Sequence, residues 1–247
     1  MSGPRVRLPE DDSGLPARQA PPVPHDAAER PGGLMCLPGV YRPQTDTLLL
    51  AAALGREGVG AGMDVLDLCT GSGALALHAA RLGARVTAVD ISRRAVASAR
   101  LNAALARLPL TVRRGDLLRA LPGRTFDVVI SNPPYVPAPG PVVPRYRAGR
   151  SWDAGLDGRI VLDRICADAA AALRPDGLLL LVQSGLSRPD ETLRRLSGSG
   201  LTASVTDRVS IPFGPVTRGR SAWLRARGLL ADDLDREELV VIRARKR

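Results

Sequence analysis

The chain has 247 residues, of which 45% are hydrophobic, and this is typical of a protein with one sizeable folded domain. It contains no apolar run near the roughly 18 residues of a membrane-spanning helix, no signal-peptide pattern and no CxxC pair among its three cysteines, so we expect a cytoplasmic protein without a membrane contact or a bound metal. The formal net charge of +10 favours an RNA, ribosome or acidic-protein partner, or else reflects an unspecialised basic surface.

Residues 1–38 differ in composition from the rest of the chain. They are rich in Pro, Gly and charged residues, and they show neither a helical nor a strand period. Such a segment buries too little apolar surface to offset the entropy lost when its backbone is ordered. We therefore expect a disordered tail over residues 1–38 and a folded domain over residues 39–247.

From residue 40 onward, short apolar runs alternate with stretches of helical period. The first helix is expected over residues 45–54, with Thr45 or Asp46 as its N-cap. Strands are then predicted over 64–68, 85–90, 110–113, 126–130 and 178–183, helices over 74–82, 93–106, 159–173 and 189–197, and a closing pair of strands over 201–209 and 239–244. Strands that alternate with helices of this length predict an α/β fold with a parallel sheet covered on both faces.

A glycine-containing loop, residues 67–73, overlaps the end of the first predicted strand, and a helix begins directly after it. Gly71 and Gly73 let a ligand approach the backbone closely, and the helix N-terminus offers free N–H groups. Asp90 ends the next strand, where a carboxylate can accept hydrogen bonds from ribose hydroxyls. The same residues satisfy the relaxed dinucleotide pattern G-x-G-x-x-A, so the loop alone leaves an NAD enzyme open.

Two further aspartates bear on which cofactor this loop would bind. Asp67 lies inside the strand before the glycines. A carboxylate there is unfavourable beside a pyrophosphate but suits the positively charged end of S-adenosylmethionine, against the alternative of a solvated strand end. Asp116 follows the third strand and is placed to reach an adenine amino group, unless it is only a turn residue. Asp67 therefore favours S-adenosylmethionine over NAD.

The sequence Asn132-Pro133-Pro134-Tyr135 follows the fourth predicted strand, at the kind of strand end where open α/β sheets bind ligands. The two prolines fix the backbone, so that Asn132 and Tyr135 are held in place before a substrate arrives. The Asn132 side-chain carbonyl and the Pro133 main-chain carbonyl can each accept an N–H, while Tyr135 stacks on a planar group. The motif predicts methylation of an amide or exocyclic amine nitrogen, against the alternative of a merely rigid loop.

Together these residues resemble the class I S-adenosylmethionine-dependent methyltransferases, and specifically the HemK-like family that methylates glutamine in translation release factors. The resemblance runs from Val40 to Ala244 and implies a methyltransferase domain over residues 39–247. It implies a doubly wound, Rossmann-like sheet of seven strands that is mostly parallel, with an antiparallel C-terminal strand.

The resemblance also implies roles for individual residues. Pro133, Pro134 and Tyr135 match the substrate-binding part of the catalytic motif that begins at Asn132, and residues 152–159 resemble the glycine-rich segment that follows it. Residues 40–47 resemble the segment before the first strand in the short branch of the family. The implied cofactor-contacting positions are Thr47, Asp67, Thr70, Gly71, Gly73, Asp90, Asp116, Leu117 and Asn132.

Three features depart from the family pattern. Cys69 stands where many relatives have glycine, which would tighten the loop against the cofactor. A proline-rich tail precedes the core, where the bacterial release-factor enzymes carry a helical domain that grips the substrate. Residues 211–229 look like an insertion before the last strand and can pack over the sheet edge or help to hold a substrate.

The leading hypothesis for the substrate is a protein glutamine side chain, as in release factors. The alternative is an adenine or guanine amino group in RNA or DNA, because the same motif geometry accepts both; a small molecule stays open as a third. The nucleic-acid alternative draws on arginines near the motif and later in the chain, while an aromatic content of 3% leaves few platforms on which flipped bases can stack. These arginines are Arg145, Arg147, Arg150, Arg218, Arg220, Arg225 and Arg227.

Overall fold

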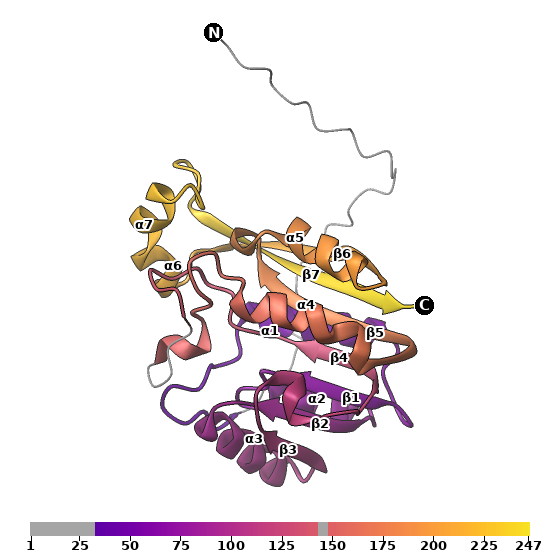
Figure 1. Ribbon diagram of the computed structural model, residues 1–247. Coiled ribbons are helices and arrows are strands. Elements are labelled where there is room, and N and C mark those ends of the chain that lie inside the picture. Colours follow the sequence, from indigo (N-terminus) through magenta and orange to yellow (C-terminus); the bar gives the residue numbers. More distant parts are fainter. Residues whose placement is uncertain (1–32, 143–147) are drawn as a thin grey trace.

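The computed structural model describes residues 33–142 and 148–247, and its centre is a seven-stranded sheet (Figure 1). The strands lie in the order β3-β2-β1-β4-β5-β7-β6. Their bounds are Asp64–Leu68 (β1), Arg85–Asp90 (β2), Leu110–Arg114 (β3), Phe126–Ser131 (β4), Leu173–Ser184 (β5), Leu201–Pro212 (β6) and Arg236–Lys246 (β7). The first five strands pair in parallel, and β7 runs antiparallel to both β5 and β6. The predicted seven-stranded, mostly parallel sheet with an antiparallel C-terminal strand is confirmed.

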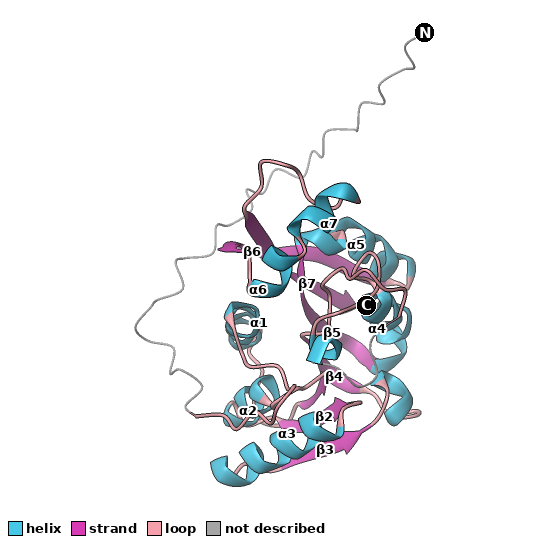
Figure 2. Cartoon of the chain, turned by 90° about the vertical axis from the view of Figure 1, so that its left-hand side faces the viewer, coloured by secondary structure: helices cyan, strands magenta, loops and turns pink. Residues whose placement is uncertain are grey.

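Helices cover both faces of the sheet, as the alternation of apolar runs predicted. Helices α1, α2 and α3 lie on one side, and α4 and α5 lie on the other, while α6 and α7 gather near the β6–β7 end of the sheet (Figure 2). The helices are α1 Thr45–Arg56, α2 Ala74–Arg81, α3 Arg93–Ala106, α4 Ile160–Ala172, α5 Pro189–Gly198, α6 Pro215–Gly219 and α7 Ser221–Ala226.

The middle of the sheet forms the core because its strands are buried on both faces. Val65 to Leu68 of β1 are all buried, and Val128 to Ser131 of β4 are as well. Strands of this kind read as continuous apolar runs rather than as alternating patterns, which is why they stood out in the sequence. Their carboxyl ends meet at one edge, and there the predicted site residues follow β1 and β4.

Three expectations about element ends are wrong. The N-cap of α1 is Gln44, which makes no side-chain capping bond, and Asp46 lies inside the helix with its carboxylate turned to two tyrosines. Strand β5 begins at Leu173, not at residue 178, because Leu173 pairs with Phe126 of β4 and so ends α4 at Ala172. Residues 211–212 continue β6, so the segment expected to be inserted over 211–229 starts as strand and only then forms α6 and α7.

Two residues before the expected boundary at residue 38 already contact the domain, and the boundary itself stays a prediction. The Met35 amide donates to Asn102 Oδ1 (2.8 Å), and Asn102 Nδ2 donates back to the Met35 carbonyl (3.0 Å). The Leu37 amide donates to Ser98 Oγ (3.1 Å), which lies on the same helix, α3. Residues 1–32 of the predicted tail lie outside the described ranges. Within those ranges, no helix has the length and apolar character needed to cross a bilayer.

Candidate active site

Three segments that carry predicted site residues meet at the carboxyl edge of the sheet. The Thr70 amide after β1 bonds to the Val89 carbonyl of β2 (3.2 Å), and the Ser131 hydroxyl of β4 bonds to the Leu68 carbonyl of β1 (2.9 Å). Asn132 Nδ2 lies 3.4 Å from Thr47 Oγ1 on α1, although the two are 85 residues apart. The glycine loop, the catalytic motif and the start of α1 therefore form one site.

The glycine loop after β1 has two glycines with different roles. Gly71 has a φ of +56°, and a Cβ added there would meet no atom within 4 Å, so its backbone is open to a ligand. Gly73 has a φ of +86°, but a Cβ there would lie 3.1 Å from the Ala99 Cβ of α3. Gly73 thus permits close packing of α3 against the loop. Cys69 has a φ of +59°, a left-handed conformation that favours glycine and explains why glycine suits this position.

Asp67 is a buried carboxylate at the end of β1, and its two oxygens differ in their hydrogen bonds. Asp67 Oδ2 accepts the Thr70 hydroxyl (2.5 Å) and the Ala76 amide (3.1 Å), so Thr70 closes the loop onto this carboxylate. Asp67 Oδ1 is buried and accepts no hydrogen bond from the residues of the described ranges. Burial raises the pKa of Asp67 to about 7, and the hydrogen bonds from Thr70 and Ala76 offset only part of that rise.

Asp90 ends β2 and contacts the glycine loop, while Asp116 follows the end of β3. Asp90 accepts the Gly71 amide at Oδ2 (3.0 Å) and the Ser92 amide at Oδ1 (2.8 Å), which fixes its carboxylate beside Gly71. Asp116 pairs with Arg164 of α4 (2.7 Å) in a half-exposed ion pair. Leu117 is buried and has a φ of +49°. The predicted contacts of Asp90, Asp116 and Leu117 with ribose and adenine stay predictions.

The motif Asn132-Pro133-Pro134-Tyr135 leaves β4 with Asn132 half-buried and with Pro133 and Tyr135 buried. Because Asn132 Nδ2 is directed to Thr47 Oγ1, the Oδ1 atom of the same amide is left as an acceptor. The Tyr135 hydroxyl donates to Asp46 Oδ2 (2.8 Å), and burial together with the Asp46 charge raises the Tyr135 pKa well above its usual value. Tyr135 is therefore a neutral phenol with a fixed hydroxyl.

Asp46 is the site residue that sequence reasoning missed, since it was considered only as a helix cap. Besides Tyr135, Asp46 Oδ2 accepts the Tyr41 hydroxyl (2.7 Å). Glu237, at the start of β7, is buried close enough to both tyrosines to raise their pKa. Burial also raises the pKa of Glu237 itself. The Tyr-Arg-Pro-Gln-Thr-Asp-Thr segment was the available signal, because it places a tyrosine and an aspartate directly before Thr47.

The glycine-rich segment that follows the motif lies alongside it. The Val136 amide donates to the Trp152 carbonyl (2.8 Å), and the Ala138 amide donates to the Gly155 carbonyl (2.8 Å). At Gly158, where φ is +74°, an added Cβ would lie 2.3 Å from the Tyr135 carbonyl oxygen and 2.9 Å from Ser187 Oγ. Only glycine fits between the motif and the Gly185–Ser187 turn. Residues 152–158 therefore pack directly against the backbone of the motif.

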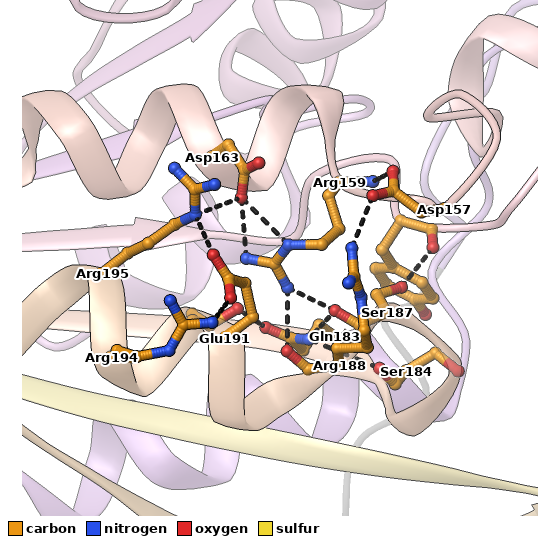
Figure 3. Close-up of polar contacts among 12 residues, drawn as sticks. Asp157, Arg159, Asp163, Gln183, Ser184, Ser187, Arg188, Glu191, Arg194 and Arg195 are labelled. Atoms are coloured by element: carbon orange, nitrogen blue, oxygen red, sulfur yellow. Dashed lines mark hydrogen bonds and ion pairs between the residues drawn. The ribbon is translucent and has the colours of Figure 1, made fainter. Parts of the chain in front are cut away.

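Arg159, at the start of α4, anchors that turn (Figure 3). Its side chain is 1% exposed, and its guanidinium donates to the carbonyls of Ser187 and Arg188 and to the carboxylate of Asp163 (2.7 Å). Ser187 in turn donates its hydroxyl to the Tyr135 carbonyl (2.6 Å). A continuous set of hydrogen bonds thus runs from α4 to the last residue of the motif.

Of the seven arginines that favoured a nucleic-acid substrate, the four in the α6–α7 region contact other groups of the protein, and the structure does not describe the side chain of Arg150. Arg220 pairs with Asp153 (2.6 Å) and donates to the Pro137 carbonyl (3.1 Å), which ties the α6–α7 segment to the chain after the motif. Arg218 donates to the Phe213 carbonyl, Arg225 donates to the Leu234 carbonyl, and Arg227 lies over the Trp223 ring. Arg145 and Arg147 lie outside the described residues.

The described ranges hold no group of three or more His, Cys, Asp or Glu side chains that could bind a metal ion.

Comparison with known proteins identifies the family. The model of the methyltransferase small domain matches residues 34–140. A putative protein N5-glutamine methyltransferase of Methanocaldococcus jannaschii is 32% identical over 177 residues, which cover 71% of this chain and 88% of the relative. The chain belongs to the HemK-like methyltransferases. A release factor glutamine methyltransferase of Deinococcus radiodurans is 39% identical over 76% of this chain, and the chain spans 66% of that relative's length.

Solved structures of other methyltransferases share the fold of this methyltransferase. The E. cuniculi Mtq2–Trm112 complex, responsible for the methylation of the eRF1 translation termination factor, matches with a TM-score of 0.59 and 28% identity, covering 85% of this chain and 99% of that one. The T. thermophilus 16S rRNA N2 G1207 methyltransferase, in complex with AdoMet and guanosine, matches with a TM-score of 0.58 and 25% identity over 86% of this chain and 46% of that one.

Proposed function

We propose that this methyltransferase uses S-adenosylmethionine to methylate the side-chain amide nitrogen of a glutamine in a protein substrate of the release-factor type. The observation that carries the proposal is the position of the Asn132-Pro133-Pro134-Tyr135 motif. It lies at the carboxyl end of β4, next to the glycine loop, with Asn132 against Thr47 and with Tyr135 anchored by its hydroxyl. In open α/β sheets, substrates and cofactors meet at this edge.

The residues around the glycine loop fit S-adenosylmethionine. The buried Oδ1 of Asp67 is an acceptor that a positively charged amino group would satisfy, and Gly71 leaves room for the ligand at the backbone. Asp90, fixed beside Gly71, would hold the ribose hydroxyls. When bound, S-adenosylmethionine supplies an electrophilic methyl group on a sulfonium. A calorimetric titration tests this fit, with S-adenosylmethionine expected to bind and NAD expected not to; the reverse preference would overturn it.

An amide nitrogen is a weak nucleophile because its lone pair is delocalised, and the motif addresses this weakness. Asn132 Oδ1 and the Pro133 carbonyl would accept the two N–H groups of the substrate amide and orient its nitrogen. The Tyr135 ring, held at its hydroxyl, would stack on the planar amide. These preorganised groups lower the barrier through position and electrostatics, so no strong general base is required.

The comparisons support glutamine as the acceptor. The archaeal relative is named a protein N5-glutamine methyltransferase and the bacterial relative a release factor glutamine methyltransferase, while the E. cuniculi complex methylates a termination factor. A nucleobase is the second candidate, which the net charge of +10 and the likeness to a 16S rRNA methyltransferase favour. The internal pairing of Arg218, Arg220, Arg225 and Arg227 weakens that candidate.

Transfer of a labelled methyl group distinguishes the two acceptors. Purified protein is incubated with methyl-labelled S-adenosylmethionine and, in parallel, with a release factor, with the same factor carrying Gln→Asn in its Gly-Gly-Gln motif, and with total RNA. We expect label in the unchanged factor alone and none with the Asn132→Ala enzyme. If the RNA is labelled and the release factor is not, the methyl acceptor is a nucleobase and not glutamine.

A further inference from the structure

We propose that Asp46 is a positioning residue for methyl transfer, which acts by holding both Tyr135 and Thr47 in place without touching the substrate. The inference rests on methyl transfer at the Asn132–Tyr135 motif, as proposed above. It does not depend on which acceptor is methylated.

The Asp46 carboxylate is 3% exposed and receives hydrogen bonds at both oxygens. Its Oδ2 accepts the hydroxyls of Tyr41 (2.7 Å) and Tyr135 (2.8 Å). Its Oδ1 accepts the Thr47 amide (2.6 Å) and the Thr47 hydroxyl (3.2 Å). Burial of a carboxylate is unfavourable unless donors replace water, and here four donors do so, with the N-terminal end of α1 adding a favourable dipole. The charge is therefore satisfied within the protein.

Each oxygen controls a different end of the catalytic motif. Through Oδ2, Asp46 fixes the position of the Tyr135 hydroxyl and with it the long axis of the ring. Through Oδ1, it orients the Thr47 hydroxyl, whose oxygen lies 3.4 Å from Asn132 Nδ2. With Thr47 Oγ1 donating to Asp46 and accepting from Asn132, the amide of Asn132 is directed so that its Oδ1 is left for the substrate. One carboxylate thus orients the first and the last side chain of the motif.

The chain contains a matched control for this role. Tyr41 donates to the same carboxylate oxygen as Tyr135, at nearly the same distance, but it lies outside the motif. Loss of the Tyr41 hydroxyl removes one donor from Asp46, but it leaves the hydrogen bond that holds Tyr135 in place. Glu237 is a second control, because it is a buried carboxylate near both tyrosines.

The test is a double-mutant cycle on kcat with Asp46→Asn, Tyr135→Phe and the double variant, using whichever acceptor the unaltered enzyme methylates. We expect each single change to lower kcat by about 10- to 100-fold, because misplacement of a reacting group by about 1 Å has effects of this size. The double variant should be no slower than the slower single one, since both remove the same hydrogen bond. The Kd for S-adenosylmethionine and the thermal midpoint of each folded variant are measured alongside.

The controls separate positioning from general destabilisation. Tyr41→Phe and Glu237→Gln are expected to keep kcat within about threefold of the unaltered enzyme, because Tyr135 and Thr47 keep their hydrogen bonds to Asp46 in both variants. Additive losses in the cycle, or an unchanged kcat in a folded Asp46→Asn protein, would overturn the proposal. If Asp46→Asn does not fold, the comparison of Tyr135→Phe with Tyr41→Phe decides, and equal kcat values for the two would overturn it.

Discussion

The hydroxyl of Ser187 donates a 2.6 Å hydrogen bond to the main-chain carbonyl of Tyr135, 52 residues earlier in the chain. Tyr135 is thus held at two points, by Ser187 at its carbonyl and by Asp46 at its hydroxyl. The two supports come from opposite sides of the motif in sequence, one from α1 and one from the turn after β5. Variants that affect only one support should therefore separate the position of the motif backbone from the orientation of the ring.

Ser187→Ala should reduce both stability and turnover. The Ser187 hydroxyl is fully buried, and its loss removes a donor from the Tyr135 carbonyl, which should lower the free energy of unfolding by about 1–3 kcal/mol. Because the motif backbone loses a support, kcat should fall as well. Ser199→Ala is the control, since the Ser199 hydroxyl also donates to main-chain carbonyls but is half-buried and remote from the motif. Urea unfolding and steady-state kinetics measure both effects, and equal kcat values for the two variants would contradict the prediction.

Gly158→Ala should displace the motif while leaving the fold intact. The new Cβ would lie 2.3 Å from the Tyr135 carbonyl oxygen, so the backbone must shift, and kcat should fall at least about tenfold. Gly123→Ala is a close control, because Gly123 has a φ of +72° but open space around its Cβ position. Both variants incur left-handed strain of about 1–2 kcal/mol. Only Gly158→Ala should lose activity; a comparable loss in both would assign the effect to strain alone.

Arg159→Leu should be strongly destabilising. The change leaves the Ser187 and Arg188 carbonyls and the Asp163 carboxylate without their buried donor, and removal of one partner from such a pair has effects of about 3–5 kcal/mol. Arg195→Leu, in the same cluster, removes a side chain that is 46% exposed and should change stability by less than about 1 kcal/mol. Chemical denaturation measures the free energy of unfolding of both variants. Similar losses in the two would show that the burial of Arg159 does not determine its contribution to stability.

Asp67 should make stability and cofactor affinity depend on pH in opposite directions. Its folded pKa of about 7 lies above the usual value near 4, so the folded protein holds this proton more tightly than the unfolded chain. The resulting stabilisation is present below about pH 4 and is lost at about 1.4 kcal/mol per pH unit as the pH rises to about 7. Asp67→Asn should abolish this slope, which urea unfolding between pH 5 and pH 8.5 measures as the difference between the two proteins.

The affinity for S-adenosylmethionine should instead rise with pH. Only the ionised Asp67 can pair with an ammonium group, so affinity should fall by up to about tenfold per unit below pH 7. The α-amino group of the ligand loses its proton near pH 8, so the tightest binding is expected at about pH 7–8. Calorimetry across this range checks the profile. An affinity that is flat with pH in the unaltered protein, or an unchanged profile in Asp67→Asn, would argue against contact between Asp67 and the ammonium group.

Sequence reasoning predicted the sheet and the Asn132–Tyr135 motif, but it did not predict the residues that fix the motif in place, Asp46 and Ser187. All seven strands were expected, and those of the buried parallel centre stood out most because they leave continuous apolar runs. The start of β5 was missed because the Arg-Pro-Asp-Gly run over residues 174–177 resembles a turn, whereas Leu173 is held in the sheet by Phe126 of a different strand. Asp46 was considered a cap because its real partner, Tyr135, lies 89 residues away. Contacts at such separations depend on packing, which no local pattern encodes.

Strand β7 is hydrogen-bonded on both sides, to β5 and to β6, and β6 has no other partner in the sheet. During synthesis, therefore, β6 leaves the ribosome as an amphipathic strand with no neighbour, and it stays open to wrong pairing until β7 has followed it. Glu237, which lies near Tyr135 and Tyr41, arrives on that same late strand. A nascent chain can thus assemble its glycine loop and its motif before β7 is in place, and the edge of the sheet formed by β5 stays unpaired until β7 is inserted.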